Sequence, residues 1–181
     1  MGDLVEEYVG LDHKDSMHDQ TVVDIFGTAY EIPEPDESFD CIICTSVLEH
    51  LEEPRAALGE SFRVLKPEGH VLYTAPMFWH LHEQPRDFYR YTEYSLRYLF
   101  ESVGYEIVTL DPMSGFWMTM LSEWNYYALV VTPRVLRPLL RPLIAAGSFI
   151  IPLIDRLETR INPRSHEWTW MHIVVARKPR E

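Results

Sequence analysis

Short apolar runs alternate along the chain with segments whose apolar residues recur at helical spacing. Residues 39–45 form such a run, rich in branched side chains and low in charge, which is typical of a strand buried on both faces of a parallel sheet. After it, Leu58, Phe62 and Leu65 recur at helical spacing, and residues 70–76 form a second apolar run. This order predicts a strand–helix–strand crossover unit.

The same pattern extends to most of the chain. A helix is predicted between Thr92, which is a favourable N-cap residue, and Gly104, which is a favourable C-cap residue. Further strands are predicted over residues 8–12, 21–25, 105–110 and 168–177. The expected fold class is therefore α/β, with a mostly parallel sheet flanked by helices.

Residues 112–167 depart from this pattern, because an apolar and aromatic stretch is followed by repeated prolines. Long unkinked helices are not expected there, since a proline inside a helix removes a hydrogen bond. Three arginines recur at helical spacing opposite leucines: Arg134, Arg137 and Arg141. We divide the chain into an α/β core (1–111), an apolar, arginine-bearing helical insertion (112–167) and a final strand with its tail (168–181).

Composition narrows the classes of function. The chain has 181 residues, enough for one domain, and a formal net charge of −12, which argues against nucleic acid as a partner. Two cysteines cannot form a disulfide framework. No signal peptide opens the sequence, and no apolar run reaches the roughly 20 residues that cross a bilayer. A cytoplasmic location, with possible peripheral membrane contact, is expected.

Cys41 and Cys44 match a short redox or zinc pattern, but residues three apart on a strand point to opposite faces. Both are predicted to be small core residues.

Polar residues follow the strand predicted over residues 39–45. In open parallel sheets, ligands bind just beyond the carboxyl ends of the strands. Ser46, Val47, Glu49 and His50 stand at that point in the sequence. A binding crevice is therefore expected there.

Three blocks carry a family resemblance. They are residues 35–40 (Pro-Asp-Glu-Ser-Phe-Asp), residues 46–51 (Ser-Val-Leu-Glu-His-Leu) and residues 63–69 (Arg-Val-Leu-Lys-Pro-Glu-Gly). In their order and spacing they resemble the middle of a class I S-adenosylmethionine-dependent methyltransferase of the type 11 group. The resemblance covers roughly residues 8 to 111 and the last ten or so. It implies a Rossmann-like fold, S-adenosylmethionine as cofactor, and methyl transfer to a small-molecule or lipid-like acceptor.

The resemblance also implies a set of cofactor-binding residues. Asp12 matches the carboxylate that binds the two ribose hydroxyls; taken alone, it reads as an acid in a surface turn. Thr28 stands where the family often has an acid that pairs with the adenine amino group. The remaining positions carried over are His13, Ala29, Tyr30, Ser46, Val47 and His50. The last strand is expected to run antiparallel at or near the sheet edge.

The family's first strand and its glycine-rich turn do not appear before Asp12, so the resemblance implies a core that is incomplete at its amino end. Three arrangements follow. The strands predicted over residues 8–12 and 39–45 pair directly, a second chain fills the gap between them, or the sequence is a fragment.

Residues 77–92 form a loop after a predicted strand end and contain many reactive groups, so this loop is the expected lid on the acceptor side. The candidate bases for methyl transfer are His80, His82, Asp87 and Tyr89, with His50 behind the cofactor. The candidate ligands for an anionic acceptor are Arg86 and Arg90. The alternative is that His82, Asp87 and Arg90 only hold the loop together.

The same loop offers the donor set of a metal site in His80, His82, Glu83 and Asp87, but the spacing is not a strong zinc signature, and no metal is predicted.

A second function remains open. The chain is then a non-catalytic interaction module that docks a partner or a membrane surface through residues 116–160. The plainer alternative for that stretch is a helical flap over the sheet or over an acceptor pocket.

Overall fold

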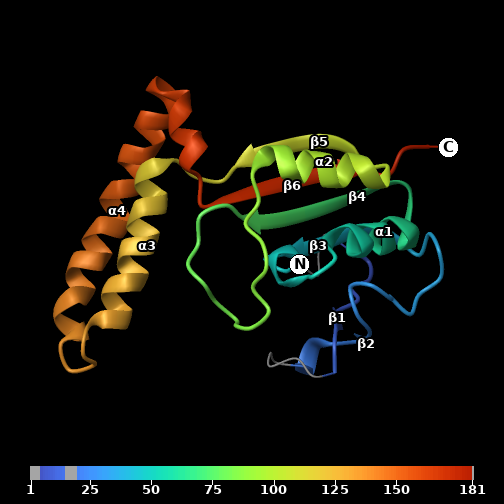
Figure 1. Ribbon diagram of the computed structural model, residues 1–181, viewed down its shortest axis with the longest axis horizontal. Helices are drawn as coiled ribbons and strands as arrows, with labels where there is room; N and C mark the ends of the chain where they lie inside the picture. Colours follow the sequence, from blue (N-terminus) through green and yellow to red (C-terminus); the bar gives the residue numbers. More distant parts are fainter. Residues whose placement is uncertain (1–4, 15–19, 181) are drawn as a thin grey trace.

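The computed structural model describes residues 5–14 and 20–180. Its main body is a four-stranded sheet in the order β3-β4-β6-β5, and a pair of long helices projects from one end of it (Figure 1). The strands are β3 (Phe39–Thr45), β4 (Leu65–Pro76), β5 (Glu106–Pro112) and β6 (Met171–Arg177). β3 and β4 pair in parallel, whereas β6 lies between β4 and β5 and pairs antiparallel with both. Three strands therefore run one way and β6 runs the other.

Two helices cover one face of this sheet. α1 (Pro54–Val64) starts with a proline, whose missing N–H costs nothing in a first turn, and α2 (Glu93–Val103) lies beside it. The Thr92 hydroxyl oxygen accepts a hydrogen bond from the Ser95 amide at 3.2 Å, and Gly104 ends α2 in the left-handed conformation (φ 112°). Both caps confirm the sequence prediction.

The hydrophobic core lies between these helices and the sheet. Val71 and Tyr73 of β4 and Val174 of β6 face Leu58 and Phe100 of the helices, and all five side chains are buried. The alternation of buried residues along β6 gives the usual period of two for a strand with one covered face.

The bounds of β3 match the prediction, but its burial does not. Cys41, Ile43 and Thr45 are exposed, and Ile43 keeps 51% of its surface accessible. β3 ends the order of the main sheet, and its second face has no helix on it in the part of the chain that the structure describes. The prediction of a strand buried on both faces is therefore wrong.

The two cysteines behave differently from each other. Cys41 is exposed, so its assignment to the core is wrong, whereas Cys44 packs against the core. Burial raises the pKa of the Cys44 thiol to about 12, with the charge of Glu49 as a smaller cause in the same direction.

The two predicted amino-terminal strands are shorter than expected. β1 (Leu11–Asp12) pairs in parallel with β2 (Ile25–Phe26), and together they form a separate two-stranded sheet. A 3₁₀ turn, η1 (Gln20–Val22), takes up residues that the hydrophobic pattern assigned to a strand. Direct pairing between β1 and β3 is not found among the described residues, because β1 pairs with β2 and β3 with β4.

Two further boundaries differ from prediction. β4 begins at Leu65 rather than residue 70, and its register with β3 shifts between Phe39 and Cys41. A 3₁₀ helix, η3 (Pro163–Trp168), takes the start of the last predicted strand, so β6 begins only at Met171. The predicted antiparallel direction of the last strand is confirmed, and it lies one strand from the edge.

The long helices form a hairpin that leads away from the sheet. α3 (Phe116–Val131) and α4 (Arg137–Ile161) lie side by side in Figure 1 and contact each other along their length. α4 continues through Pro142 and Pro152, so neither proline ends the helix, and the absence of long unkinked helices stays a prediction. Packing along α3 holds α4 together where each proline removes one backbone hydrogen bond.

α4 also has a property that the sequence analysis did not predict. By length and composition alone it could cross a membrane, with a mean hydropathy of 1.4 over its most apolar window, of which only 6% is buried. Residues 143–154 carry no charged side chain but are too few to cross a membrane. The helix extends beyond them at both ends.

A carboxylate from α4 fixes the base of this hairpin. Asp155 is buried and accepts hydrogen bonds from the amides of Gly115 (2.9 Å) and Met118 (3.0 Å) at the start of α3. The Ser165 hydroxyl accepts one from the Phe116 amide at 3.0 Å. The first amides of α3 therefore find their acceptors in residues far along the chain.

Candidate functional site

The loop of residues 77–92 folds back over the carboxyl end of β3. The Phe88 and Tyr89 amides donate to the Glu49 carbonyl at 2.9 and 3.3 Å, within a short 3₁₀ turn, η2 (Leu48–His50). The buried Tyr91 hydroxyl donates to the Leu48 carbonyl at 2.9 Å. These bonds bring the loop and η2 together at the carboxyl end of β3, where the binding crevice is predicted.

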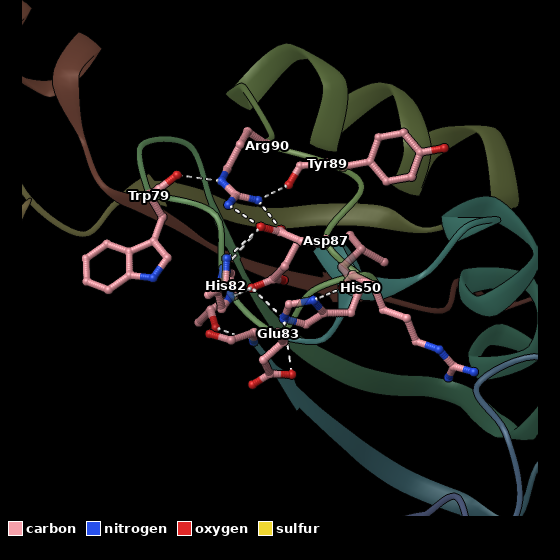
Figure 2. A network of polar contacts seen from close by, with 12 residues as sticks. His50, Trp79, His82, Glu83, Asp87, Tyr89 and Arg90 are labelled. Atoms are coloured by element: carbon pink, nitrogen blue, oxygen red, sulfur yellow. Dashed lines mark hydrogen bonds and ion pairs between the residues drawn. The ribbon is translucent and has the colours of Figure 1, made fainter. Parts of the chain in front are cut away.

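A clasp between Asp87 and Arg90 holds the loop in shape (Figure 2). Arg90 donates to both carboxylate oxygens of Asp87, at 2.6 and 3.0 Å, and to the carbonyls of Trp79, His80 and Tyr89. All five guanidinium N–H groups thus have acceptors within the loop. This arrangement matches the alternative of loop structure, and it leaves Arg90 no donor for the acceptor-binding role suggested by the sequence.

The carboxylate of Asp87 is likewise occupied by hydrogen bonds within the loop. Its side chain is only 2% exposed, and its second oxygen also accepts the His82 amide at 2.9 Å. The Arg90 guanidinium and the His82 amide hold the pKa of Asp87 well below its usual range. An ionised, fully bonded carboxylate is a poor general base, so Asp87 is better described as a positioning group.

Glu49, His50 and His82 come together beside this clasp. The Nε2 atoms of His50 and His82 lie 3.9 and 4.0 Å from the same Glu49 oxygen, Oε1. The two imidazole rings meet edge to face, with centroids 4.7 Å apart. His50 and His82 side chains keep 13% and 22% of their surface exposed, whereas Glu49 keeps 1%. The cluster is therefore open on its histidine side.

Glu49 is the least expected member of this cluster. Burial raises the pKa of its carboxyl group, while the nearby His50, His82 and Arg90 act in the opposite direction. Its Oε2 atom and Nδ1 of His82 are buried without a hydrogen-bond partner among the described residues. Such unpaired buried polar atoms are uncommon and costly in folded proteins.

The backbone is unusual on both sides of the cluster. Ser46 and Glu83 adopt left-handed conformations, with φ of 54° and 51°. Non-glycine residues seldom do so, and such residues concentrate at functional sites.

The other loop candidates point elsewhere. His80 stacks on Tyr126 of α3, with ring centroids 3.6 Å apart, and its Nδ1 lies 3.5 Å from the Glu123 carboxylate. Tyr89 is exposed in part and donates its hydroxyl to the Glu52 carbonyl at 3.0 Å. Arg86 is exposed, and its carbonyl oxygen contacts Nδ1 of His50. The four-residue metal set weighed from sequence is thus not assembled, since His80 turns to the hairpin.

The residues predicted to bind a cofactor fall into two groups. In the first, the Asp12 carbonyl accepts the Gly27 amide at 3.1 Å, and the Asp12 carboxylate accepts the His13 amide at 2.7 Å. This ties Asp12 and His13 to the turn that carries Thr28, Ala29 and Tyr30. In the second, Ser46 and Val47 lie exposed just after β3 and lead into His50.

Tyr30 connects the turn of the first group to the chain just beyond the second. Its hydroxyl oxygen accepts a hydrogen bond from the amide of Glu53, three residues after His50, at 3.3 Å. Thr28 uses its hydroxyl oxygen within its own turn, where it accepts the amides of Tyr30 and Glu31 at 3.2 and 3.1 Å. A hydroxyl has two acceptor lone pairs, and both have donors here. Its contact to adenine therefore stays a prediction, while its shaping of the turn is observed.

Comparisons with known proteins find similar sequences and folds. Residues 1–73 match a family model described as a methyltransferase domain. The chain is 49% identical over 45 residues to an uncharacterized methyltransferase of Schizosaccharomyces pombe, covering 25% of this chain and 16% of that protein. It is 30% identical over 117 residues to the ubiquinone/menaquinone biosynthesis C-methyltransferase UbiE of Proteus mirabilis, covering 48% and 47%.

The fold is likewise similar to that of a SAM-dependent methyltransferase from Archaeoglobus fulgidus, with a TM-score of 0.57 at 15% identity over 94% of this chain and 75% of that one.

These findings support a class I S-adenosylmethionine-dependent methyltransferase domain, and the family model matches it over residues 1–73.

This chain spans less than half the length of the two curated relatives named above.

Sequence reasoning placed Glu49 at the crevice but gave it no role in the methyltransferase site. Its signal was its position beside His50, directly after a strand end. Asp155, which fixes the hairpin, carried no local signal, because its partners lie 37 and 40 residues away.

Proposed function

We propose that the chain transfers a methyl group from S-adenosylmethionine to a small-molecule acceptor at the rim where the loop of residues 77–92 covers η2. The observation that carries this proposal is the docking of that loop on the Glu49 carbonyl. It brings His82 of the loop beside the segment from Ser46 to His50, which contains Glu49 and which the family resemblance places next to the cofactor. Enclosure of this kind holds an acceptor near the donor atom, which is the main requirement of an in-line displacement.

The residues present fit the adenosine half of the cofactor. The Asp12 carboxylate can accept two hydroxyl hydrogen bonds, and Tyr30 and Val47, each 38% exposed, offer apolar surface for a purine. The sequence contains no glycine-rich turn, so no residue of this chain is assigned to the methionine half. When bound, S-adenosylmethionine supplies an electrophilic methyl group on a sulfonium.

His82 is the loop residue best placed to take a proton from the acceptor. Its Nδ1 lies 3.5 Å from the Asp87 carboxylate, which favours the tautomer with the proton on Nδ1. Nε2 then carries the lone pair, on the partly exposed side of the ring. Asp87 and Arg90 position this imidazole without contacting the acceptor.

Cofactor binding is tested by calorimetry with S-adenosylmethionine and its demethylated product. We expect Asp12→Ala to weaken binding about tenfold, since a charge-assisted hydrogen-bond pair is worth about 1.5–3 kcal/mol. Asp111→Ala, which removes an exposed carboxylate from β5, should leave binding unchanged. The proposal fails if neither ligand gives heat or a thermal shift with this chain or with a longer form that includes upstream residues.

A second function is supported by the hairpin, and we propose that it rests on an anionic membrane surface. Large apolar side chains are exposed on both helices: Trp124 is 67% exposed on α3, and Leu139, Leu143 and Phe149 are 70–79% exposed on α4. An open groove of about 560 Å³ runs between the helices, lined by residues such as Trp117, Met120 and Tyr127. Monomeric proteins seldom expose this much contiguous apolar surface without a partner.

The charge of the hairpin indicates which kind of membrane surface it would contact. The distal part of the hairpin, residues 124–154, contains three arginines and no acidic residue, although the whole chain carries a net charge of −12. Arg134 lies in the connecting turn, so only Arg137 and Arg141 belong to α4, and the three do not form one helical stripe as predicted. Basic residues beside apolar surface favour anionic lipid headgroups. Trp79 and His80 contact Tyr126, so the hairpin also adjoins the loop and would suit a lipid-like acceptor.

Co-sedimentation with phosphatidylglycerol and phosphatidylcholine vesicles tests the membrane contact. We expect the wild type to pellet with the anionic vesicles and Arg134/Arg137/Arg141→Glu to bind at least tenfold more weakly, at about 1 kcal/mol for each basic residue. The matched control is Arg55/Arg97/Arg180→Glu, which makes the same charge change away from the hairpin. Equal pelleting of the two triple variants would contradict the proposal, and self-association without vesicles would instead identify a second copy as the occupant.

A further inference from the structure

We propose that Glu49, His50 and His82 bind a divalent transition-metal ion. The carboxylate and the two imidazoles offer one ligand atom each, and these atoms lie within 4.8 Å of one another. Ligand atoms on a tetrahedral zinc ion, at roughly 2.0–2.2 Å from the metal, are roughly 3.3–3.6 Å apart. The two separations from Glu49 Oε1, 3.9 and 4.0 Å, exceed this range by a few tenths of an ångström, and because the third pair is bounded only at 4.8 Å, the two imidazoles would have to approach each other by up to about an ångström. This inference stands independently of methyl transfer.

The histidines are held in the orientation that ligands require. Nδ1 of His50 contacts the Arg86 carbonyl, which can only accept, so this nitrogen carries the proton and Nε2 carries the lone pair. Nδ1 of His82 lies 3.5 Å from the Asp87 carboxylate, so its Nε2 is again the nitrogen toward Glu49. Metal-binding histidines characteristically direct their second nitrogen to a carbonyl or a carboxylate. The Arg86 carbonyl fills this role for His50, whereas the Asp87 carboxylate lies beside Nδ1 of His82 at 3.5 Å without forming a hydrogen bond.

Direct contact among the three groups does not satisfy them. Separations of 3.9 and 4.0 Å are too long for hydrogen bonds between Glu49 and either imidazole. Oε2 of Glu49, which is 1% exposed, has no hydrogen-bond partner in residues 5–14 and 20–180. A cation bound to Oε1 and the two Nε2 atoms would neutralise this buried carboxylate and lower the cost of burying its unpaired oxygen.

The surroundings also favour a cation and leave it a way in. The Glu83 carboxylate lies 3.7 Å from Nε2 of His50 and is 47% exposed at the mouth of the cluster. Arg90 is the nearby positive group, and Asp87 already pairs with it. The cluster therefore keeps the negative charge of Glu49 and Glu83, with an entrance on the side of His82.

The donor set selects the class of ion. Two imidazole nitrogens with one carboxylate suit zinc, cobalt or nickel, whereas magnesium and calcium prefer oxygen ligands alone. Three protein ligands leave a coordination position open, as in catalytic zinc sites. A bound metal would occupy Nε2 of His82, so acceptor deprotonation would then depend on the metal rather than on the free imidazole.

The test is calorimetric titration of the chelator-treated full chain with Zn²⁺, Co²⁺ and Mg²⁺, without S-adenosylmethionine. We expect one Zn²⁺ or Co²⁺ per chain, no heat with Mg²⁺, a zinc-induced rise in Tm, and visible absorption from bound Co²⁺. His82→Ala and Glu49→Gln should each weaken binding at least tenfold, because even outer partners of metal ligands are worth 10–100-fold.

The matched controls are His80→Ala, two residues away in the same loop, and His70→Ala, which removes an exposed histidine from β4. Both should bind as the wild type does. The partly exposed His82 keeps the test usable if Glu49→Gln fails to fold, as judged by circular dichroism. The inference is overturned if the wild type binds no Zn²⁺, or if His82→Ala and His80→Ala bind it equally. Neither result bears on cofactor binding, which calorimetry with S-adenosylmethionine tests separately.

Discussion

Asp87→Asn is expected to lower the free energy of unfolding by about 2–3 kcal/mol at neutral pH, because it breaks a nearly buried ion pair. The carboxylate is 2% exposed and holds two arms of Arg90 and the His82 amide. Asparagine offers one acceptor in place of two and carries no charge, so part of the Arg90 guanidinium is left without its counter-charge. The loop of residues 77–92 should loosen, and with it the position of His82.

The dependence on pH provides an independent check. The pKa of Asp87 is lowered in the folded state from an ordinary value of 3.8, so its stabilising contribution is present above that value. It is lost as the pH falls from about 4 through the folded-state pKa. Urea unfolding should therefore show that the difference in free energy of unfolding between wild type and Asp87→Asn is largest at pH 7 and smaller at pH 3.

The matched control for this change is Asp40→Asn. Asp40 is 85% exposed and pairs with Lys66, so its loss should change stability by less than about 0.5 kcal/mol. If the two variants unfold at the same urea concentration, the clasp does not stabilise the loop as described.

Asp155→Ala is expected to lower the free energy of unfolding by a similar amount, about 2–3 kcal/mol. The change leaves the amides of Gly115 and Met118 without acceptors at the buried start of α3, and it removes a negative charge from a helix N-terminus. Asp155→Asn should fall between alanine and the wild type, since its side-chain carbonyl can still accept.

Hydrogen exchange locates this effect. Amides in the first turn of α3 should exchange faster in Asp155→Ala, while those of β4 and β6 should change only in proportion to global stability. Arg156→Ala, at the neighbouring exposed position, is the control and should stay within about 0.5 kcal/mol of the wild type. If the amides of residues 115–119 exchange at the same rate in Asp155→Ala as in Arg156→Ala, Asp155 does not fix the hairpin.

These two carboxylates matter for the proposed functions because each sets the position of one working surface. Asp87 fixes the loop that carries His82, and Asp155 fixes the direction in which the hairpin leaves the sheet. Since Trp79 and His80 contact Tyr126, the loop and the hairpin also meet directly. A ligand bound at either surface therefore has a path of contacts to the other.

The amino-acid sequence by itself determined the parts of the fold whose causes are local. The bounds of β3 and the caps of α2 at Thr92 and Gly104 follow from periodicity and cap chemistry within a few residues. The family resemblance likewise depends on short blocks that stand close together.

Only the tertiary structure decided which faces are covered and which distant side chains meet. A local pattern cannot tell whether a second layer lies on β3, so the exposure of Ile43 was missed. Nor can it bring Glu49 to His82, or Asp155 to Gly115, because loop closure and packing make those contacts between remote parts of the chain. The proposed metal cluster and the fixed hairpin both depend on such contacts between remote residues.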